Sequence, residues 1–198
     1  MAKRRKVSNP LALAVLAQLL MGPTHPYEIG RRLTVQDKGR NIKYTRGSLY
    51  MVVEQLVKAS FVAEDGTVRD TQRPERTIYA LTEDGKAELY DWLRDLVARP
   101  EHEFPKFGVA LSLLVVLSPA DAVGLLGQRL AALTEEVEQI RADVKASTDG
   151  GLAWVFVAEE EYRLAVLDAE ARFVTTLIAR LEKPEYVRMW QEMFQGET

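Results

Sequence analysis

The residues from Asn41 to Val62 read NIKYTRGSLYMVVEQLVKASFV, and this stretch decides the fold. Thr45 is expected to cap a helix, because its hydroxyl can accept a hydrogen bond from a backbone amide of the first turn. Apolar residues then recur at spacings of three and four, which places them on one face of that helix. These residues are Leu49, Val52, Val53 and Leu56. The side chains between them need not face the core and can meet another molecule.

Two short runs of β-branched and aromatic residues follow this helix. Residues 61–63 and 77–81 predict two strands, and Asp65-Gly66 predicts a turn after the first strand. The arginines of the segment between the strands are Arg69, Arg73 and Arg76. A helix with a polar first turn, followed by an arginine-tipped hairpin, is typical of a winged helix-turn-helix that binds DNA. The alternative is a small α+β domain in which this helix is packed and the arginines are solvated.

Two further helices are predicted before this stretch. Asn9-Pro10 is a favourable helix start, and Gly22-Pro23 ends that helix. The second helix begins near Pro26. The residues of this helix that are expected to pack are Tyr27, Ile29 and Leu33. His25 has no second ligand at metal-binding spacing, so neither a metal-binding nor a catalytic role is expected for it.

The charge of the chain is divided unevenly along its length. The 198 residues carry a net charge of −3, yet residues 1–81 hold 14 Lys and Arg against 7 Asp and Glu, a net of +7. Residues 82–198 carry a net of −10. Because attraction to phosphate depends on the local field, the basic half is compatible with nucleic-acid binding, although ordinary charge asymmetry gives the same numbers. The run KRRK at residues 3–6 either reaches DNA phosphates as an arm or is a solvated tail.

Several classes of protein are disfavoured by composition. The chain has no cysteine, which excludes disulfides, thiolate metal sites and cysteine nucleophiles. No apolar run reaches roughly 18 residues, and no cleavage site follows the basic N-terminus, so we expect a cytoplasmic protein without a membrane span. The sequence has no phosphate-binding loop, no metal-spaced cluster and no nucleophile motif. We therefore expect no enzyme, no cofactor and no metal.

The second half of the chain is predicted to be helical. Thr82 caps a helix that runs to about Ala98, and the prolines and charges of residues 100–106 mark a domain boundary. We predict a winged helix-turn-helix domain with a linker helix at residues 1–99 and a helical dimerisation domain at residues 100–198. Phe107–Leu117 is strongly apolar and is predicted to be a buried helix. Ser118-Pro119 starts the next helix, and a short helix is expected at Glu185–Phe194.

Two long helices of the second domain carry coiled-coil seams, in which apolar residues alternate at spacings of three and four. The residues predicted to make the dimer are Leu126, Leu130, Leu133, Val137, Ile140, Leu164, Leu167, Val174, Ile178 and Leu181. One winged helix contacts a single half-site, and a dimer doubles that contact at a fixed spacing. The seams can pair within one chain, across two chains, or both. The alternative is a self-contained helical hairpin on a monomer.

Several motifs in the first half resemble those of the PadR family of transcriptional regulators. Residues 11–29, LALAVLAQLLMGPTHPYEI, resemble the first helix of the family and the start of its second helix. GSLY at 47–50 resembles its recognition helix, and IYALTEDGKAELYDW at 78–92 resembles its second wing strand and linker helix. The resemblance covers roughly residues 9–95. The positions that depart from the family pattern are Pro26, Ser48 and Met51.

The resemblance implies a homodimeric repressor that binds a double-stranded DNA operator and is often released by a small apolar or aromatic effector. The residues that we expect at the DNA are Lys43, Thr45, Arg46, Ser48, Tyr50, Met51, Arg69, Arg73 and Arg76. An effector pocket lined by Trp92, Trp154 and Phe156 is the weaker prediction, because ordinary packing also explains these residues. The alternative function is an interaction module whose coiled helices are the working surface and which does not bind DNA.

Overall fold

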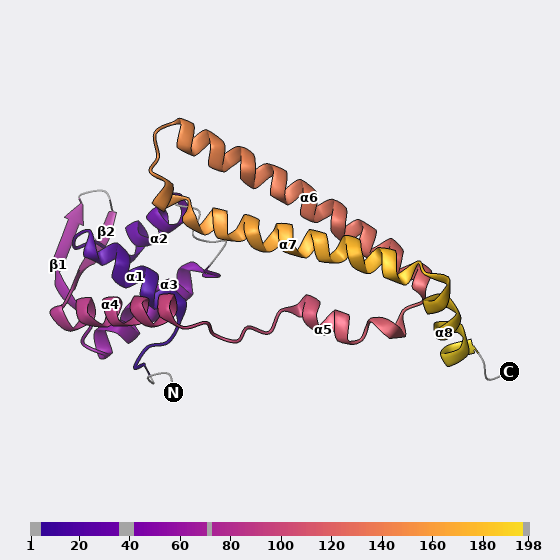
Figure 1. Ribbon diagram of the computed structural model, residues 1–198. Coiled ribbons are helices and arrows are strands. Elements are labelled where there is room, and N and C mark those ends of the chain that lie inside the picture. The colour runs from indigo at the N-terminus through magenta and orange to yellow at the C-terminus, as the bar shows by residue number, and fades with distance from the viewer. Residues whose placement is uncertain (1–4, 36–41, 71–72, 196–198) are drawn as a thin grey trace. The chain divides into compact units, whose positions relative to one another are not determined.

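The computed structural model describes residues 5–35, 42–70 and 73–195, without the side chains at 68–75 and 195. The chain divides into two compact units, unit 1 (Met1–His102) and unit 2 (Glu103–Thr198). The elements of unit 1 are α1 (Pro10–Leu20), α2 (Pro26–Val35), α3 (Arg46–Lys58), β1 (Val62–Asp70), β2 (Arg73–Leu81) and α4 (Glu83–Ala98) (Figure 1). The elements of unit 2 are α5 (Lys106–Ser112), the 3-10 turn η2 (Leu114–Val116), α6 (Pro119–Asp149), the 3-10 turn η3 (Trp154–Phe156), α7 (Ala158–Leu181) and α8 (Pro184–Gln195). The predicted fold class, mainly helical with a two-stranded wing, is confirmed.

The core of unit 1 is formed by one apolar face from each of its helices. The predicted stripe of α3 is confirmed, because its four residues are at most 2% exposed. These residues are Leu49, Val52, Val53 and Leu56. They lie in one cluster with buried side chains of α1, α2 and α4. Ile29 and Leu33 of α2 pack there as predicted, whereas Tyr27 does not and is 46% exposed.

The wing is a longer hairpin than the sequence predicted. Its strands pair antiparallel, and Asp65-Gly66, which was predicted to be a turn, lies inside β1. The register shifts between Glu64 and Thr67, so β1 has one extra residue at this point. Gly66 has φ of +106°, a conformation that serves a bulge as well as a turn. The strand therefore continues past Gly66 to Asp70.

Two backbone hydrogen bonds join the wing to the segment that leads into α2. The amide of Thr24 donates to the carbonyl of Tyr79 at 3.0 Å, and the amide of Tyr79 donates back at 2.9 Å. This short bridge adds the residues before α2 to the edge of β2. The bridge fixes the position of the wing relative to the start of α2.

The start of α4 packs closely against the start of the wing. Thr82 caps α4 as predicted, since its hydroxyl accepts a hydrogen bond from the amide of Gly85 at 3.0 Å. A Cβ atom at Gly85 would lie 2.0 Å from the carbonyl oxygen of Phe61. Only glycine permits this approach, which carries Leu89 and Trp92 of α4 into the core.

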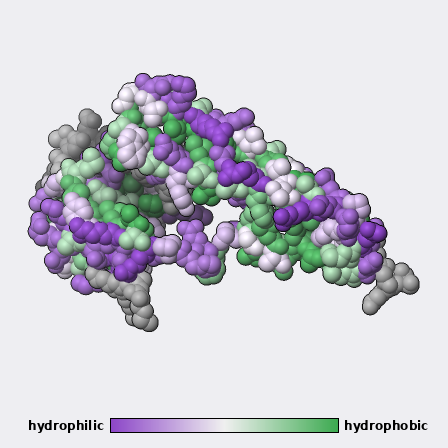
Figure 2. Space-filling view, viewed as in Figure 1, coloured by the Kyte–Doolittle hydropathy of each residue, from purple (hydrophilic) through white to green (hydrophobic). Residues whose placement is uncertain are grey.

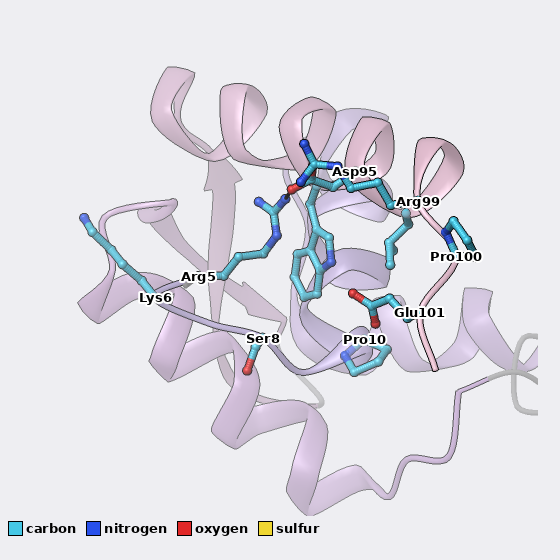
Figure 3. Close-up of a pocket in the computed structure, with 10 residues that line it drawn as sticks. Arg5, Lys6, Ser8, Pro10, Asp95, Arg99, Pro100 and Glu101 are labelled. Carbon is cyan, nitrogen blue, oxygen red and sulfur yellow. Dashed lines mark hydrogen bonds and ion pairs between the residues drawn. The ribbon is translucent and has the colours of Figure 1, made fainter. Parts of the chain in front are cut away.

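The N-terminal segment is fastened to α4 by Arg5 (Figure 3). Its guanidinium donates hydrogen bonds to the carboxylates of Glu88 (2.7 Å), Asp91 (3.1 Å) and Asp95 (2.6 Å). The side chain of Arg5 is 6% exposed, and its guanidinium carbon lies 5.3 Å from the centroid of the Trp92 ring. Three carboxylates surround the buried charge, so its desolvation is offset by charge-assisted hydrogen bonds.

For Arg5, this arrangement corrects both readings of the basic run at residues 3–6. Arg5 is neither a DNA-reaching arm nor a solvated tail, and Lys6 lies over the ring of Phe61 at 5.4 Å. The other two residues of the run are outside the described part of the chain. Arg5 is held in this position because Glu88, Asp91 and Asp95 of α4 recur at spacings of three and four and so share one helix face.

Unit 2 is built on the antiparallel pair of α6 and α7 (Figure 1). Ser118 caps α6 as predicted, because its hydroxyl accepts from the amide of Asp121 at 3.1 Å. Ion pairs cross between the two helices, as in the contact of Arg141 with Asp168 at 2.8 Å. Exposed pairs of this kind contribute about 1 kcal/mol or less, so the apolar seam carries most of the pairing.

The ten seam residues predicted for dimerisation are covered within unit 2. Those that are buried are Leu126, Leu133, Val137, Ile140, Val174 and Leu181. Those that are partly buried are Leu130, Leu164, Leu167 and Ile178. The two seams therefore pair with each other inside one chain, which is one of the arrangements that the sequence left open.

The prediction of a buried helix at Phe107–Leu117 is wrong. The helix α5 ends at Ser112, η2 follows it, and neither contains a buried residue. Phe107 and Leu114 pack partly against the core of unit 2. Side chains that remain exposed by more than half are Val109, Leu113 and Val116. An apolar run of this kind indicates a surface that another surface covers. The described residues of unit 2 do not cover these three side chains.

The short C-terminal helix is confirmed as α8. It is tied to η2 by a hydrogen bond from Nε1 of Trp190 to the carbonyl of Val115 at 2.9 Å. In the described parts of the chain, no helix is both long and apolar enough to cross a membrane.

Replacing Gly85 with alanine tests the close approach of α4 to the wing. We expect Gly85→Ala to destabilise unit 1 by at least about 2 kcal/mol, because the new methyl group must displace the backbone of Phe61. Thermal or urea unfolding of the full chain measures this change. Gly124→Ala in α6 is the matched control, since no atom lies within 4 Å of its added Cβ. The control should stabilise its helix by up to about 1 kcal/mol, and equal effects of the two substitutions would contradict this account.

Candidate nucleic-acid interface

The helix α3 has an exposed surface beside its buried stripe. Arg46, Tyr50 and Met51 are exposed on it, with Tyr50 at 41% and Met51 at 59%. Lys43 is also exposed, just before the helix begins. Because the buried stripe fixes the rotation of α3, this face is held away from the core. A cation, a phenol and a flexible thioether on one exposed helix face can contact phosphates and base edges.

Two hydroxyls fix the first residue of α3. The hydroxyl of Thr45 accepts from the amide of Ser48 at 3.1 Å, and the amide of Thr45 donates to the hydroxyl of Ser48 at 2.8 Å. This reciprocal capping box confirms Thr45 as the cap. It sets where α3 begins, and so it positions Arg46 in the first turn.

Tyr27 of α2 contacts arginines from two other elements. The guanidinium carbon of Arg46 is 5.6 Å from the centroid of the Tyr27 ring, and that of Arg76 is 5.2 Å away. Arg46 belongs to α3 and Arg76 to β2, so the ring joins the helix-turn-helix to the wing. Both distances are within the range of cation–π attraction.

His25 lies beside the same cluster. Its Nδ1 accepts a hydrogen bond from the amide of Glu28 at 3.1 Å, and its Nε2 lies 3.4 Å from a guanidinium nitrogen of Arg76. Burial and the charge of Arg76 lower the pKa of His25 below its usual value, against a smaller opposing effect of Glu28. The imidazole is therefore held in its neutral form and caps the first turn of α2.

Two further arginines of α2 are engaged by a carboxylate. Arg31 donates two hydrogen bonds to Glu28, at 2.7 and 2.8 Å, and Arg32 donates one at 3.2 Å. The hydrogen bonds from Arg31 lower the pKa of Glu28 to about 2, with a further contribution from Arg32. Glu28 is thus charged at neutral pH and neutralises part of the positive field at this end of α2.

A groove of about 400 Å³ separates α2 from the start of α3. Aromatic and basic side chains line much of it, and these are Tyr27, Tyr44, Tyr50, Arg31 and Arg46. Thus α3 and the groove beside it form one exposed surface with phenols and cations together.

The predicted DNA-contact residues fall into two groups. The structure brings together Lys43, Thr45, Arg46, Ser48, Tyr50 and Met51 around α3 and places Arg76 beside them on β2. The side chains of Arg69 and Arg73 lie outside the described residues.

The predicted effector residues belong to different units of the chain. Trp92 belongs to unit 1 and is 6% exposed, whereas Trp154 and Phe156 belong to η3 of unit 2 and are 69% and 68% exposed. Trp92 lines a cavity of about 850 Å³ next to Arg5 (Figure 3). Among the described residues, no group of three or more His, Cys, Asp or Glu side chains could hold a metal ion.

Sequence reasoning missed two residues of the cluster. Tyr27 was expected to pack in the core, and His25 was considered only as a metal ligand or catalytic group. The exposed position of Tyr27 in the first turn of α2, opposite the buried Ile29, follows from the helical period. Its contact with Arg76 does not, since that contact depends on the wing folding back to Thr24.

The fold and the exposed face of α3 define a winged helix-turn-helix protein of the DNA-binding class. Residues 13–91 match the model of the transcriptional regulator PadR-like family. Members of this family are transcriptional regulators and not enzymes. No curated protein matches the chain.

Several solved structures share the fold. Bacillus subtilis PadR in complex with operator DNA is 18% identical, with 87% of this chain and 99% of that chain covered and a TM-score of 0.73. The same protein in complex with p-coumaric acid has a TM-score of 0.70 at the same identity and coverage. The virulence activator AphA of Vibrio cholerae is 16% identical, with 86% of this chain and 97% of that chain covered and a TM-score of 0.65.

Proposed function

We propose that this PadR-like regulator binds a specific duplex operator as a homodimer and represses transcription from it. The observation that carries the proposal is the exposed face of α3, with Arg46, Tyr50 and Met51 above a fully buried stripe. The structure of Bacillus subtilis PadR with operator DNA supports the same use of this fold.

The groups on this surface suit both parts of DNA recognition. Arg46 can bond to a guanine edge or to a phosphate, and Tyr50 and Met51 can pack against thymine methyl groups in the major groove. Lys43 and Arg76 flank the helix and suit phosphates, which position a protein on the duplex. The net charge of +7 over residues 1–81 supports the approach of this surface to DNA, although the whole chain is acidic.

Substitutions on the exposed face of α3 test the proposed DNA contact. We expect Arg46→Ala and Tyr50→Ala each to weaken binding to the gene's own upstream region by at least about tenfold, which corresponds to about 1.4 kcal/mol. A gel-shift titration over a salt series measures the affinity. The oligomeric state and the melting temperature should stay unchanged, because both side chains are exposed.

Two results would contradict the proposal. One is a wild-type protein that shows no specific shift, or one whose affinity is indifferent to salt. The other is unfolding of Tyr50→Ala, which would show that this side chain serves the core instead. Val97→Ala on α4 is the control, since that side chain is 87% exposed and lies on another helix.

The dimer contact proposed here uses apolar residues that unit 2 leaves exposed. The ten seam residues pack between α6 and α7 within one chain, where six are buried and four are partly buried. Figure 2 shows hydrophobic side chains gathered over α5 and the turn after it. The most exposed apolar side chains of α5, η2, the residue between them and α8 are Val109, Leu113, Val116, Met193 and Phe194. Clustered exposed apolar side chains mark interaction sites in many proteins, and a second copy of the chain is the partner that a two-half-site operator requires.

A pair of charges on this surface tests the dimer. We expect Leu113→Glu with Val116→Glu to give a monomer, because two carboxylates would be desolvated at the contact. Sedimentation velocity of the full chain at micromolar concentration measures the mass. Val97→Glu in unit 1 is the matched control and should remain a dimer. A monomeric wild-type protein, or a double variant that stays dimeric, would contradict this assignment.

We also propose that a small aromatic effector relieves repression by binding at Trp92. The cavity there is lined by Lys6 and Arg99 and by the indole, together with the carboxylates of Asp95 and Glu101 (Figure 3). The cations and the aromatic ring are the groups that an aromatic acid would contact. The complex of Bacillus subtilis PadR with p-coumaric acid supports an effector of this chemistry. Trp154 and Phe156, which are exposed on unit 2, are the alternative location.

Tryptophan fluorescence separates these two locations. We expect p-coumaric acid to quench the wild-type protein saturably, and the response to be lost in Trp92→Phe but retained in Trp154→Phe. In the wild-type protein, the same ligand should weaken the gel shift over the concentration range in which it quenches the fluorescence. Loss of the response in Trp154→Phe instead would move the site to η3. No response in any variant would contradict an aromatic-acid effector of this type.

A further inference from the structure

Two cations on the DNA-facing surface are held by an aromatic ring instead of a carboxylate. Arg46 and Arg76 lie 5.6 and 5.2 Å from the Tyr27 ring, and no carboxylate in the described part of the chain pairs with either. Arg31 and Arg32, in contrast, both pair with the carboxylate of Glu28. Contact with a ring face orients a guanidinium without occupying its N–H donors, so Arg46 and Arg76 keep charge and donors for an anion.

The ring of His25 adds a third donor at the same place. Its Nδ1 accepts from the amide of Glu28, so in the neutral ring the proton is on Nε2. That N–H then faces the guanidinium of Arg76 across 3.4 Å. Two donors this close repel each other unless an acceptor lies near both. A phosphate oxygen that accepts from both groups would remove this conflict.

The backbone holds these donors in place before any ligand arrives. Thr24 and Tyr79 exchange two hydrogen bonds, of 3.0 and 2.9 Å. Thr24 directly precedes His25, and Tyr79 is three residues from Arg76 on β2. The distance between the start of α2 and the middle of the wing is therefore set by backbone pairing, and the site is preorganised.

We propose that His25, Arg46 and Arg76 form one binding site for a phosphodiester of the DNA backbone, with Tyr27 as the residue that positions both arginines. The inference rests on the proposed DNA binding and names a contact within it. A phosphate here would touch α2, α3 and the wing at once, so it would fix the angle at which α3 enters the major groove. Such a contact positions the protein on the duplex and carries no sequence preference of its own.

The lack of sequence preference makes the site testable without a known operator. The probe is a fluorescein-labelled duplex of 30 base pairs with random sequence, and anisotropy is measured from low to moderate salt. We expect Arg76→Gln to weaken binding several-fold and to reduce the slope of log K against log salt by roughly 0.9 per protomer. Tyr27→Leu should reduce affinity and slope in the same direction, and Tyr27→Phe should bind like the wild-type protein because it keeps the ring.

Two further variants separate positioning from direct contact. His25→Asn keeps an acceptor that can cap α2 but lacks the Nε2 donor, so we expect weaker binding with an unchanged melting temperature. Tyr27→Leu should cost little in a protein that already carries Arg46→Gln and Arg76→Gln, because the ring then has no cation to position. Tyr90→Leu is the matched control. Tyr90 is similarly exposed and stacks on Arg94 at 5.9 Å, but it lies on α4 beside acidic residues.

The outcomes distinguish this site from the proposed function. If the wild-type protein binds no duplex at any salt concentration, DNA binding fails and the site fails with it. If the wild-type protein binds and the Arg76, Tyr27 and His25 variants match it in affinity and salt slope, only the phosphate site is overturned. Competition by inorganic phosphate at constant ionic strength, strong enough to displace the duplex at millimolar concentration, would assign the site to free phosphate and also overturn it.

Discussion

Burial of one face of α3 is the constraint on which the rest of unit 1 depends. The stripe of Leu49, Val52, Val53 and Leu56 packs into the core formed with α1, α2 and α4, so α3 cannot rotate about its axis. The exposed surface beside the stripe is therefore held in a fixed direction. The capping box of Thr45 and Ser48 then fixes where the helix begins, and together these two features position Arg46 and Tyr50.

A second set of contacts fixes the position of the wing, as the buried stripe fixes the rotation of α3. Gly85 lets α4 approach Phe61 at the start of β1, and the bridge of Thr24 with Tyr79 ties β2 to the start of α2. The ring of Tyr27 collects one arginine from α3 and one from β2 as a result. Thus the packing that stabilises unit 1 also gathers the cations on its exposed surface. In unit 2 the apolar seams pack within the chain, and apolar side chains of α5 and η2 are among those that stay exposed.

Much of this arrangement could be predicted from local sequence patterns. Periodicity identified the buried face of α3, and the caps at Asn9, Thr45, Thr82 and Ser118 follow from residue type and position. Prediction from local sequence failed where one sequence signal is compatible with two different backbone structures. Asp65-Gly66 supplies the positive φ that both a turn and a bulge require, and only the pairing of β1 with β2 decides between them.

Contacts between distant residues were beyond prediction for a different reason. Arg5 binds carboxylates more than 80 positions away, and the acidic stripe on α4 shows only that some cation or solvent faces it. Tyr27 meets Arg76 only because the wing returns to Thr24. The seams of α6 and α7 likewise specify an apolar partner but not whether it lies in the same chain. In each case the residue type is evident from the sequence and its partner depends on tertiary structure.

Hydrogen exchange with and without duplex DNA from the gene's own upstream region tests the central claim most directly. The account predicts that DNA slows exchange in three segments of unit 1: the start of α2 after Thr24, the first two turns of α3, and β2 around Arg76. The seam between α6 and α7 should exchange at the same rate in both states. Protection confined to unit 2, or no protection at the start of α3, would contradict the assignment of this surface to DNA.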